Sequence, residues 1–170
     1  AQDAERDRAH EEKRQRPVAA GRVSKRAAYL LSTALGLGAA LLAVASGEPE
    51  ALTLVALYVT INLSYSLGAK HFPLLDVFLL SSLYMLRVIL GCTLLEVRAS
   101  NWLLVCSSAL ALFLSLAKRR AEFVAGHDTS HRPALSGYDQ AFLDQAMGIS
   151  ASVTVVAYAL YTIEAPVLIA

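Results

Sequence analysis

Long apolar runs separated by short polar stretches dominate the chain. Five of them stand out, at about residues 27–46, 51–69, 74–95, 102–118 and 147–168. Each is close to the ~20 residues that a helix needs to cross about 30 Å of hydrocarbon. Leu and Ala are mixed with Val, Ile and Thr without a period of two, which favours helices over barrel strands. The pattern therefore predicts an all-α, polytopic membrane helix bundle with five transmembrane helices in this chain.

The composition agrees with this prediction. Of the 170 residues, 56% are hydrophobic, against roughly 45–50% in a soluble globular domain. The two cysteines, Cys92 and Cys106, lie inside apolar runs. They indicate neither a disulfide framework nor a metal site, and we interpret them as small apolar packing residues.

The basic residues indicate how the helices are oriented. Eight Lys and Arg residues lie in 1–26, one lies in the connector after the second run, and four lie in 118–146. These thirteen of the fifteen basic residues fall on alternate connectors, and so on one side of the membrane. The opposite connectors carry Glu48, Glu50 and Glu96, with Arg98 alone. By the positive-inside rule, the basic side is cytoplasmic.

Two aspartates stand four residues apart in the charged stretch before the first apolar run. Asp3 and Asp7 would share one face of a helix. A divalent cation that bridges them and a substrate phosphate would offset their repulsion, and Mg²⁺ commonly uses one or two carboxylates with phosphate oxygens. A solvated charged helix with local ion pairs explains the same spacing.

Basic side chains follow these aspartates and end at Pro17. Guanidinium and ammonium groups beside carboxylates suit a metal–diphosphate ligand, because Arg matches the geometry of phosphate oxygens. Anchoring to anionic lipid head groups is the alternative. The residues concerned are Lys13, Arg14 and Arg16.

A polar stripe runs along the second apolar run. Asn62, Ser66 and Lys70 recur every four residues, with Tyr58 and Tyr65 close by. Hydrogen bonds between helices would explain Asn62 and Ser66, and Lys70 could extend to the membrane boundary. A wall of a pocket for an anionic head group is the functional interpretation.

The third run carries Asp76 near its start and Arg87 eleven residues later, with Tyr84 nearby. Eleven residues are about three turns, so Asp76 and Arg87 fall on one face of a helix. An Arg within a span costs at least ~2.5 kcal/mol on insertion scales. We therefore expect Arg87 to face the bundle interior with an anionic partner, either at a functional site or in a buried structural ion pair.

The fourth run ends in the sequence KRRAE, in which Lys118 and Glu122 are one helical turn apart. The polar stretch that follows, up to residue 146, is expected to be a long connector, and long connectors are often binding loops. Its His127 and His131 lack the further ligands that a zinc site needs. The sequence contains no P-loop, nucleophile elbow or dinucleotide-binding fingerprint.

Together these motifs resemble the UbiA-type intramembrane prenyltransferase superfamily. Asp3 and Asp7 match the last two aspartates of its first motif, Asn-Asp-x-x-Asp-x-x-x-Asp, whose leading Asn-Asp would lie just before Ala1. Tyr65, Ser66 and Lys70 match the Tyr/Ser/Lys helix of the superfamily.

The second motif of the superfamily, another Asp-x-x-x-Asp, is replaced here by KRRAE. In this respect the chain is similar to the polyprenyl-phosphate phosphoribosyltransferase branch, although Glu11 stands where that branch usually has proline. The segments that carry the likeness are Asp7–Pro17, Leu75–Arg87, Lys118–Glu122 and Arg132–Leu143.

The resemblance implies a nine-helix fold around a central cavity that opens to the cytoplasm and to lipid. The five helices here would then be helices three to seven. The chain would be a single transmembrane domain over 1–170, incomplete at both ends. It would lie in a bacterial inner membrane with its active site facing the cytoplasm.

The resemblance also implies a reaction: transfer of 5-phosphoribose from phosphoribosyl pyrophosphate to a polyprenyl phosphate, with release of diphosphate. Mg²⁺ is the expected cofactor, and no nucleic-acid partner is expected. The implied catalytic residues are Asp3, Asp7 and Glu122, with both aspartates as metal ligands. The implied substrate-binding residues are Lys13, Arg14, Arg16, Tyr65, Ser66, Lys70, Arg87, Lys118 and Arg119.

Two other functions stay open at this point. One is a prenyltransferase of the same superfamily that joins a prenyl diphosphate to an aromatic or other acceptor. The other is a non-catalytic membrane protein or transporter, in which Asp76 and Arg87 form a buried pair and the basic stretch is an anchor.

Overall fold

The computed structural model describes residue 8 and the ranges 13–124 and 137–164. The chain forms two compact units, Ala1–Gly47 and Glu48–Ala170. Each unit is described by itself below.

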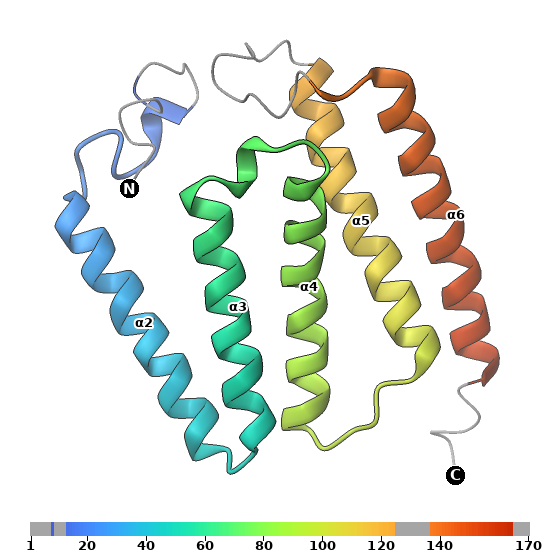
Figure 1. The fold of residues 1–170 in the computed structure, drawn as a ribbon, viewed down its shortest axis with the longest axis horizontal. Helices are drawn as coiled ribbons and strands as arrows, with labels where there is room; N and C mark the ends of the chain where they lie inside the picture. Colours follow the sequence, from blue (N-terminus) through green and yellow to red (C-terminus); the bar gives the residue numbers. More distant parts are fainter. Residues whose placement is uncertain (1–7, 9–12, 125–136, 165–170) are drawn as a thin grey trace. The chain divides into compact units, whose positions relative to one another are not determined.

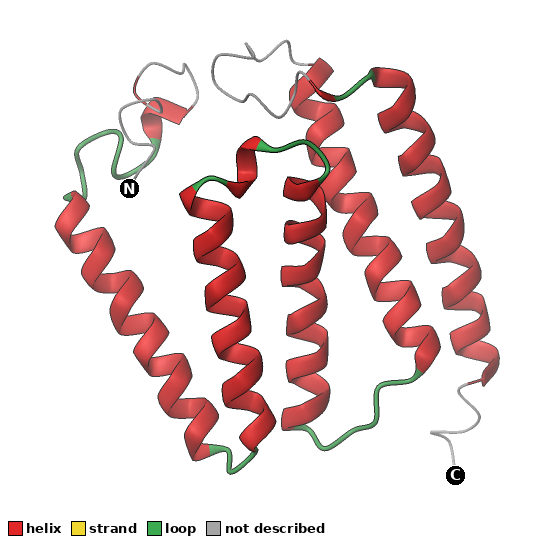
Figure 2. Ribbon diagram, viewed as in Figure 1, coloured by secondary structure: helices red, strands yellow, loops and turns green. Residues whose placement is uncertain are grey.

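Five long α-helices make up most of the described chain (Figure 1). Figure 2 shows no strand in the ranges that the structure describes. All five helices are long and apolar enough to cross a membrane. The predicted all-α, five-span architecture is therefore confirmed. The helices are α2 (Lys25–Ala45), α3 (Pro49–Leu67), α4 (Leu75–Leu94), α5 (Asn101–Val124) and α6 (Gln140–Glu164), and the short 3₁₀ turns are η1 (Lys13–Gln15) and η2 (Ala69–His71).

In the first unit, a compact turn precedes α2. Arg8 donates from Nε to the carbonyl of Ala19 at 3.0 Å, and Arg22 donates from Nη2 to the carbonyl of Gln15 at 2.7 Å. The side chain of Ser24 then caps α2 by accepting from the backbone N–H of Ala27. The polar stretch before the first span is thus folded back on itself by side-chain to backbone hydrogen bonds.

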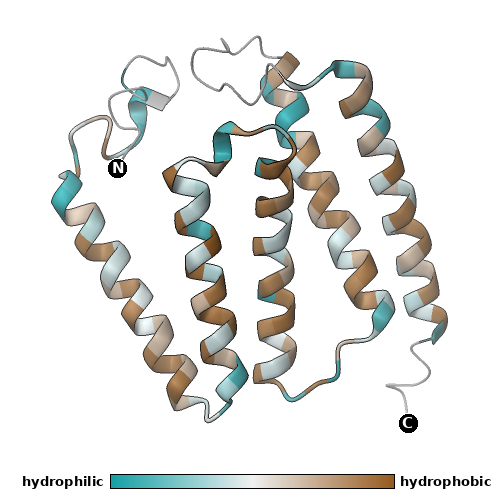
Figure 3. Cartoon of the chain, in the orientation of Figure 1, coloured by the Kyte–Doolittle hydropathy of each residue, from teal (hydrophilic) through white to brown (hydrophobic). Residues whose placement is uncertain are grey.

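In the second unit, successive helices pack side by side: α3 on α4, α4 on α5 and α5 on α6 (Figure 1). These neighbours run antiparallel, so the end of α3, the start of α4, the end of α5 and the start of α6 lie together (Figure 1). We call this the basic end. Figure 3 shows hydrophilic residues at the helix ends and apolar residues along their middle parts.

A cluster of buried apolar residues lies at the basic end. Val77, Leu116, Tyr138 and Leu143 are buried against one another. Many large apolar side chains elsewhere on the helices are exposed. This is the opposite of a soluble bundle, and it is typical of helices whose surroundings are hydrocarbon.

Two helix boundaries differ from the prediction. The fourth apolar run ended at 118 and its helix was expected to end within KRRAE, whereas α5 continues to Val124. The helix α6 begins at Gln140 rather than at 147. The prediction followed apolar residues only. Helices continue beyond the apolar run here because Arg119 pairs with Glu122 within α5, and because Asp139 accepts the first backbone hydrogen bond of α6, from Leu143. Much of the predicted connector 118–146 is therefore helical.

The turn between α3 and α4 packs tightly against the residues that precede α6. Leu74 has a positive φ of 64°, a conformation that is costly for a residue with a branched side chain. A Cβ placed on Gly137 would lie 2.3 Å from Cγ of Pro73. Only glycine fits at position 137 without displacing the proline ring.

We expect Gly137→Ala to destabilise the protein by about 1–3 kcal/mol, because the added methyl group overpacks against a rigid ring. Thermal unfolding of the purified protein in detergent measures this effect. Gly148→Ala in α6 is the matched control, since a Cβ there meets nothing within 4 Å. Equal melting temperatures for the two variants would contradict the tight packing of Gly137 on Pro73.

Candidate functional site

A buried ion pair joins α4 to α5 at the basic end. Asp76 in the first turn of α4 and Arg119 near the end of α5 both have 0% exposure. Nε of Arg119 lies 3.0 Å from Oδ2 of Asp76, although without the alignment of a hydrogen bond. Removing one partner of such a pair leaves an uncompensated buried charge, which typically costs about 3–5 kcal/mol.

Tyr138, just before α6, binds the other oxygen of the same carboxylate. Its hydroxyl donates to Oδ1 of Asp76 at 2.6 Å and accepts from the backbone N–H of Leu74 at 2.7 Å. Burial, and then the hydrogen bond to Asp76, raises the pKa of the Tyr138 phenol above its usual value. Tyr138 therefore stays protonated at neutral pH and remains a donor to Asp76.

Glu122 forms the other end of this network. Nη1 of Arg119 donates to Oε2 of Glu122, whose side chain retains 18% exposure in the second unit. Nη2 of Arg119 is buried and has no hydrogen-bond partner in the described part of the chain. These contacts form one network, which connects the fully buried carboxylate of Asp76 to the partly exposed carboxylate of Glu122. Its members, in order of contact, are Leu74, Tyr138, Asp76, Arg119 and Glu122.

The three basic residues of KRRAE have different surroundings. Lys118 is exposed, whereas Arg119 is fully buried. Arg120 pairs with Asp144 of α6, and both of these side chains are substantially exposed. An exposed pair of this kind contributes little to stability. Arg119, which was predicted to bind substrate, therefore has no exposed surface in the second unit.

Arg87 lies deeper in the span, on α4. Its Nη2 donates to the hydroxyl of Tyr58 on α3 at 2.5 Å, and its guanidinium lies 5.3 Å from the ring centre of Tyr58 and 5.6 Å from that of Tyr84. Cation–π contacts and a phenol oxygen give partial compensation for the charge in an apolar setting.

The buried Asp76–Arg87 pair, which belonged to the alternative of a non-catalytic membrane protein, is not present. Asp76 pairs with Arg119 instead. The two residues share a face of α4, but eleven residues correspond to about 16 Å of rise, which is too far for direct contact. Arg87 has Tyr58 as its hydrogen-bond partner instead of a carboxylate, and its side chain is exposed in the second unit rather than buried in it.

The predicted residues of the α3 stripe lie close to the basic end. Tyr65 and Ser66 belong to the last turn of α3, and Lys70 belongs to η2. All three are half-buried in the second unit. They lie on the same end of the unit as Asp76 and Glu122, as the stripe predicted.

The other predicted residues belong to the first unit. Lys13 lies in η1, and Arg14 and Arg16 are exposed. Asp3 and Asp7 lie outside the described residues, so their proposed metal role stays a prediction. Within the ranges that the structure describes, no group of three or more His, Cys, Asp or Glu side chains could hold a metal ion.

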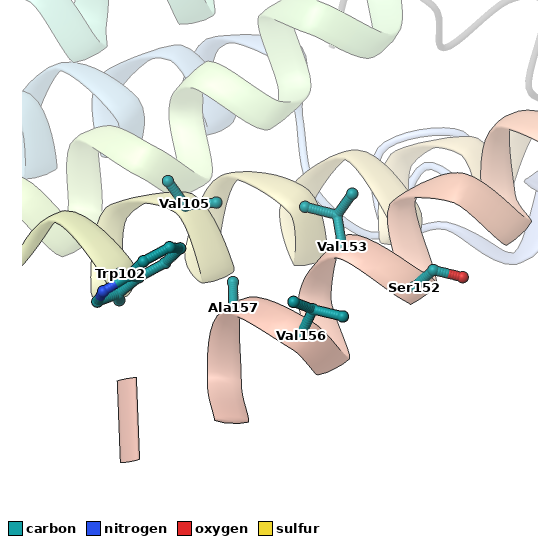
Figure 4. A pocket seen from close by; sticks show the side chains of 6 residues that line it. All are labelled: Trp102, Val105, Ser152, Val153, Val156 and Ala157. Atoms are coloured by element: carbon teal, nitrogen blue, oxygen red, sulfur yellow. The ribbon is translucent and has the colours of Figure 1, made fainter. Parts of the chain in front are cut away.

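An apolar groove of about 250 Å³ lies between α5 and α6 (Figure 4). Trp102 at the start of α5 places it toward the end opposite the basic one. Its lining contains no charged side chain, so it suits a hydrocarbon chain rather than a phosphate. The lining residues are Trp102, Val105, Ser152, Val153, Val156 and Ala157.

These features define an integral membrane protein whose second unit gathers ionisable side chains at one end of its helices. The chain belongs to the UbiA prenyltransferase family, whose model matches residues 1–168. This confirms the superfamily that the motifs indicated.

Curated relatives are similar to nearly the whole chain. Decaprenyl-phosphate phosphoribosyltransferase of Mycolicibacterium smegmatis is 35% identical over 169 residues, and that of Corynebacterium glutamicum is 33% identical over 164 residues. The enzyme of the same name from Mycobacterium tuberculosis is 32% identical over 168 residues. Each match covers 95% of this chain and 49–54% of the relative. The chain thus spans about half the length of the curated relatives it matches.

Asp76 and Tyr138 are the site residues that the sequence-based list of catalytic and binding residues left out. Both had been noticed as polar residues, but their partners are distant in sequence: the Tyr138–Asp76 hydrogen bond joins positions 62 residues apart. A carboxylate at the start of an apolar run was the available signal, because such a residue is rarely left without a partner.

We expect Tyr138→Phe to destabilise the protein by about 1.5–3 kcal/mol, because it removes a hydrogen bond to a buried carboxylate and leaves Leu74 N–H without its acceptor. Denaturation in detergent, followed by circular dichroism, measures the change. Tyr158→Phe is the control, since Tyr158 is 60% exposed. A loss for Tyr138→Phe no larger than that of the control would show that the network does not stabilise the basic end.

Proposed function

We propose that the protein transfers 5-phosphoribose from phosphoribosyl pyrophosphate to a polyprenyl phosphate and releases diphosphate. The observation that carries this proposal is the 32–35% identity, over 95% of the chain, to relatives named decaprenyl-phosphate phosphoribosyltransferase. The mixed network of Arg119 and Glu122 supports it, because KRRAE stands where other members of the superfamily have a second pair of aspartates.

The proposed chemistry needs charge stabilisation more than covalent catalysis. The bond between the anomeric carbon and the diphosphate oxygen breaks, and an oxocarbenium-like centre develops. An oxygen of the lipid phosphate then attacks that carbon, so the products are phosphoribosylated lipid and diphosphate. Positioning and neutralisation of the leaving group supply most of the rate acceleration.

The first unit is proposed to bind the diphosphate. Asp3 and Asp7 supply hard carboxylate oxygens of the type that Mg²⁺ prefers, and a bound Mg²⁺ would neutralise the leaving group. Lys13, Arg14 and Arg16 are proposed to bind phosphate oxygens.

The basic end of the second unit is proposed to bind the remaining polar groups of the substrates. Lys70 and Lys118 would receive anionic groups, assisted by Tyr65 and Ser66. Glu122 would bind a ribose hydroxyl or the metal ion. Arg119 would act on the substrate through Glu122, because its guanidinium is buried against Asp76.

Arg87 is proposed to meet an anionic group deeper in the span. Its contacts with Tyr58 and Tyr84 hold the guanidinium but give it no counter-charge. The apolar faces of the helices, including the groove between α5 and α6, are proposed to accept the polyprenyl chain.

The family itself favours one second candidate, a prenyltransferase that joins a prenyl diphosphate to an aromatic or other acceptor. One assay separates the two. Purified full-length protein is incubated with Mg²⁺, labelled phosphoribosyl pyrophosphate and polyprenyl phosphate, and the lipid fraction is counted.

We expect the wild-type protein to form labelled lipid, and we expect this product to be absent when a chelator removes Mg²⁺. The Asp7→Asn variant should be slower by about 10²-fold or more, since a lost metal contact removes charge stabilisation from the transition state. Glu164→Gln, an exposed carboxylate at the end of α6, is the control and should stay within about twofold. Transfer from a prenyl diphosphate instead would favour the second candidate, and a fully active Asp7→Asn would remove its metal role.

The basic end is proposed to face the cytoplasm, where phosphoribosyl pyrophosphate is available. In intact cells, a membrane-impermeant maleimide should label Val97→Cys but not Gln140→Cys. Both positions are exposed; Val97 lies between α4 and α5, and Gln140 begins α6 at the opposite end of the second unit. Both variants are made in a background with Cys92 and Cys106 replaced by alanine. Labelling of Gln140→Cys alone would reverse the orientation.

A further inference from the structure

The carboxylate of Asp76 is the point at which three parts of the second unit meet. Oδ1 accepts from Tyr138, which precedes α6, and Oδ2 faces Arg119 near the end of α5. Asp76 itself begins α4. Both flanks of the segment that joins α5 to α6 are therefore attached to one buried side chain.

Stability alone is a poor explanation for this arrangement. Replacing a buried ion pair by well-packed apolar side chains is often neutral or stabilising, because two charges must lose their water. The network also includes a backbone conformation of high energy, because Tyr138 binds the N–H of Leu74, whose φ is positive. Strain of this kind concentrates at functional positions.

The network has one partly exposed carboxylate, Glu122. Glu122 lies in the last turn of α5, where a long side chain has several rotamers of similar energy. The hydrogen bond from Arg119 Nη1 selects one of them. Arg119 can do this because its own guanidinium is held by burial and by the charge of Asp76.

We propose that Asp76 and Tyr138 are positioning residues that fix Arg119 and, through it, the carboxylate of Glu122. This inference rests on the proposed function, in which Glu122 binds substrate or metal. Catalytic groups must be held within a fraction of an ångström by the side chains behind them, and loss of such support typically lowers activity by 10–100-fold at metal sites.

A double-mutant cycle in the full-length protein tests this proposal. Asp76→Asn should lower kcat/KM for phosphoribosyl transfer by about 10–100-fold. In the Glu122→Gln background, the same change should cost less than about threefold, because the group that Asp76 positions is already gone. An equal loss in both backgrounds would show that Asp76 acts independently of Glu122, and would overturn the proposal.

Two further variants separate positioning from general damage to the fold. Ser81→Ala removes a buried contact between the same two helices, since Ser81 Oγ lies 3.3 Å from Ser115 Oγ, and should leave kcat/KM within about twofold. If Asp76→Asn does not fold, Tyr138→Phe takes its place in the cycle, because it keeps both buried charges. Tyr138→Phe should also lower kcat/KM more in the wild-type background than in the Glu122→Gln background, with a smaller loss than that of Asp76→Asn.

Hydrogen exchange gives a readout that does not depend on turnover. Asp76→Asn should speed amide exchange in residues 119–124 and 137–144 relative to Ser81→Ala, and unchanged exchange in both segments would overturn the proposal. Absence of labelled lipid from the wild-type protein would instead overturn the proposed function. The two failures are therefore distinguishable.

Discussion

The positively charged guanidinium of Arg119 is fully buried, and the ion pair with the carboxylate of Asp76 stabilises it there. The desolvation cost of each ion is several kcal/mol, so neither side chain could remain buried and charged without the other. Because the two residues come from α4 and α5, their attraction also fixes how the basic ends of these helices meet. Tyr138 extends the arrangement to the start of α6.

Several local features follow from this constraint. The hydrogen bond from Leu74 N–H to Tyr138 offsets part of the cost of its positive φ. Gly137 allows the backbone to approach Pro73 closely enough for Tyr138 to reach Asp76. The apolar cluster around Val77 and Leu143 contains Tyr138, the residue that donates to Asp76, so this cluster lies beside the ion pair. The turn at Leu74, the glycine at 137 and the apolar cluster are therefore all adjacent to the contact between Tyr138 and Asp76.

Arg119 at the basic end and Arg87 within the span are stabilised in different ways. Arg119 is fully buried and is compensated by carboxylates. Arg87 is exposed in the second unit and has two tyrosine rings and a phenol oxygen. Rings attract a cation without neutralising it. Arg87 therefore keeps a charge that can meet an anionic group, whereas Arg119 is committed to holding Glu122.

The sequence alone determined the five spans, the family and the types of residue at the charged ends. Apolar run length and the helical repeat are local properties, so they can be recognised without the tertiary structure. The start of α6 was expected about seven residues too late, because the prediction followed apolar residues and the first turns of α6 are polar. Only the tertiary structure decided that Asp76 pairs with Arg119 rather than with Arg87. Partners far apart in the chain meet according to which helices pack together, and residues that share a face of one helix can still be about three turns apart.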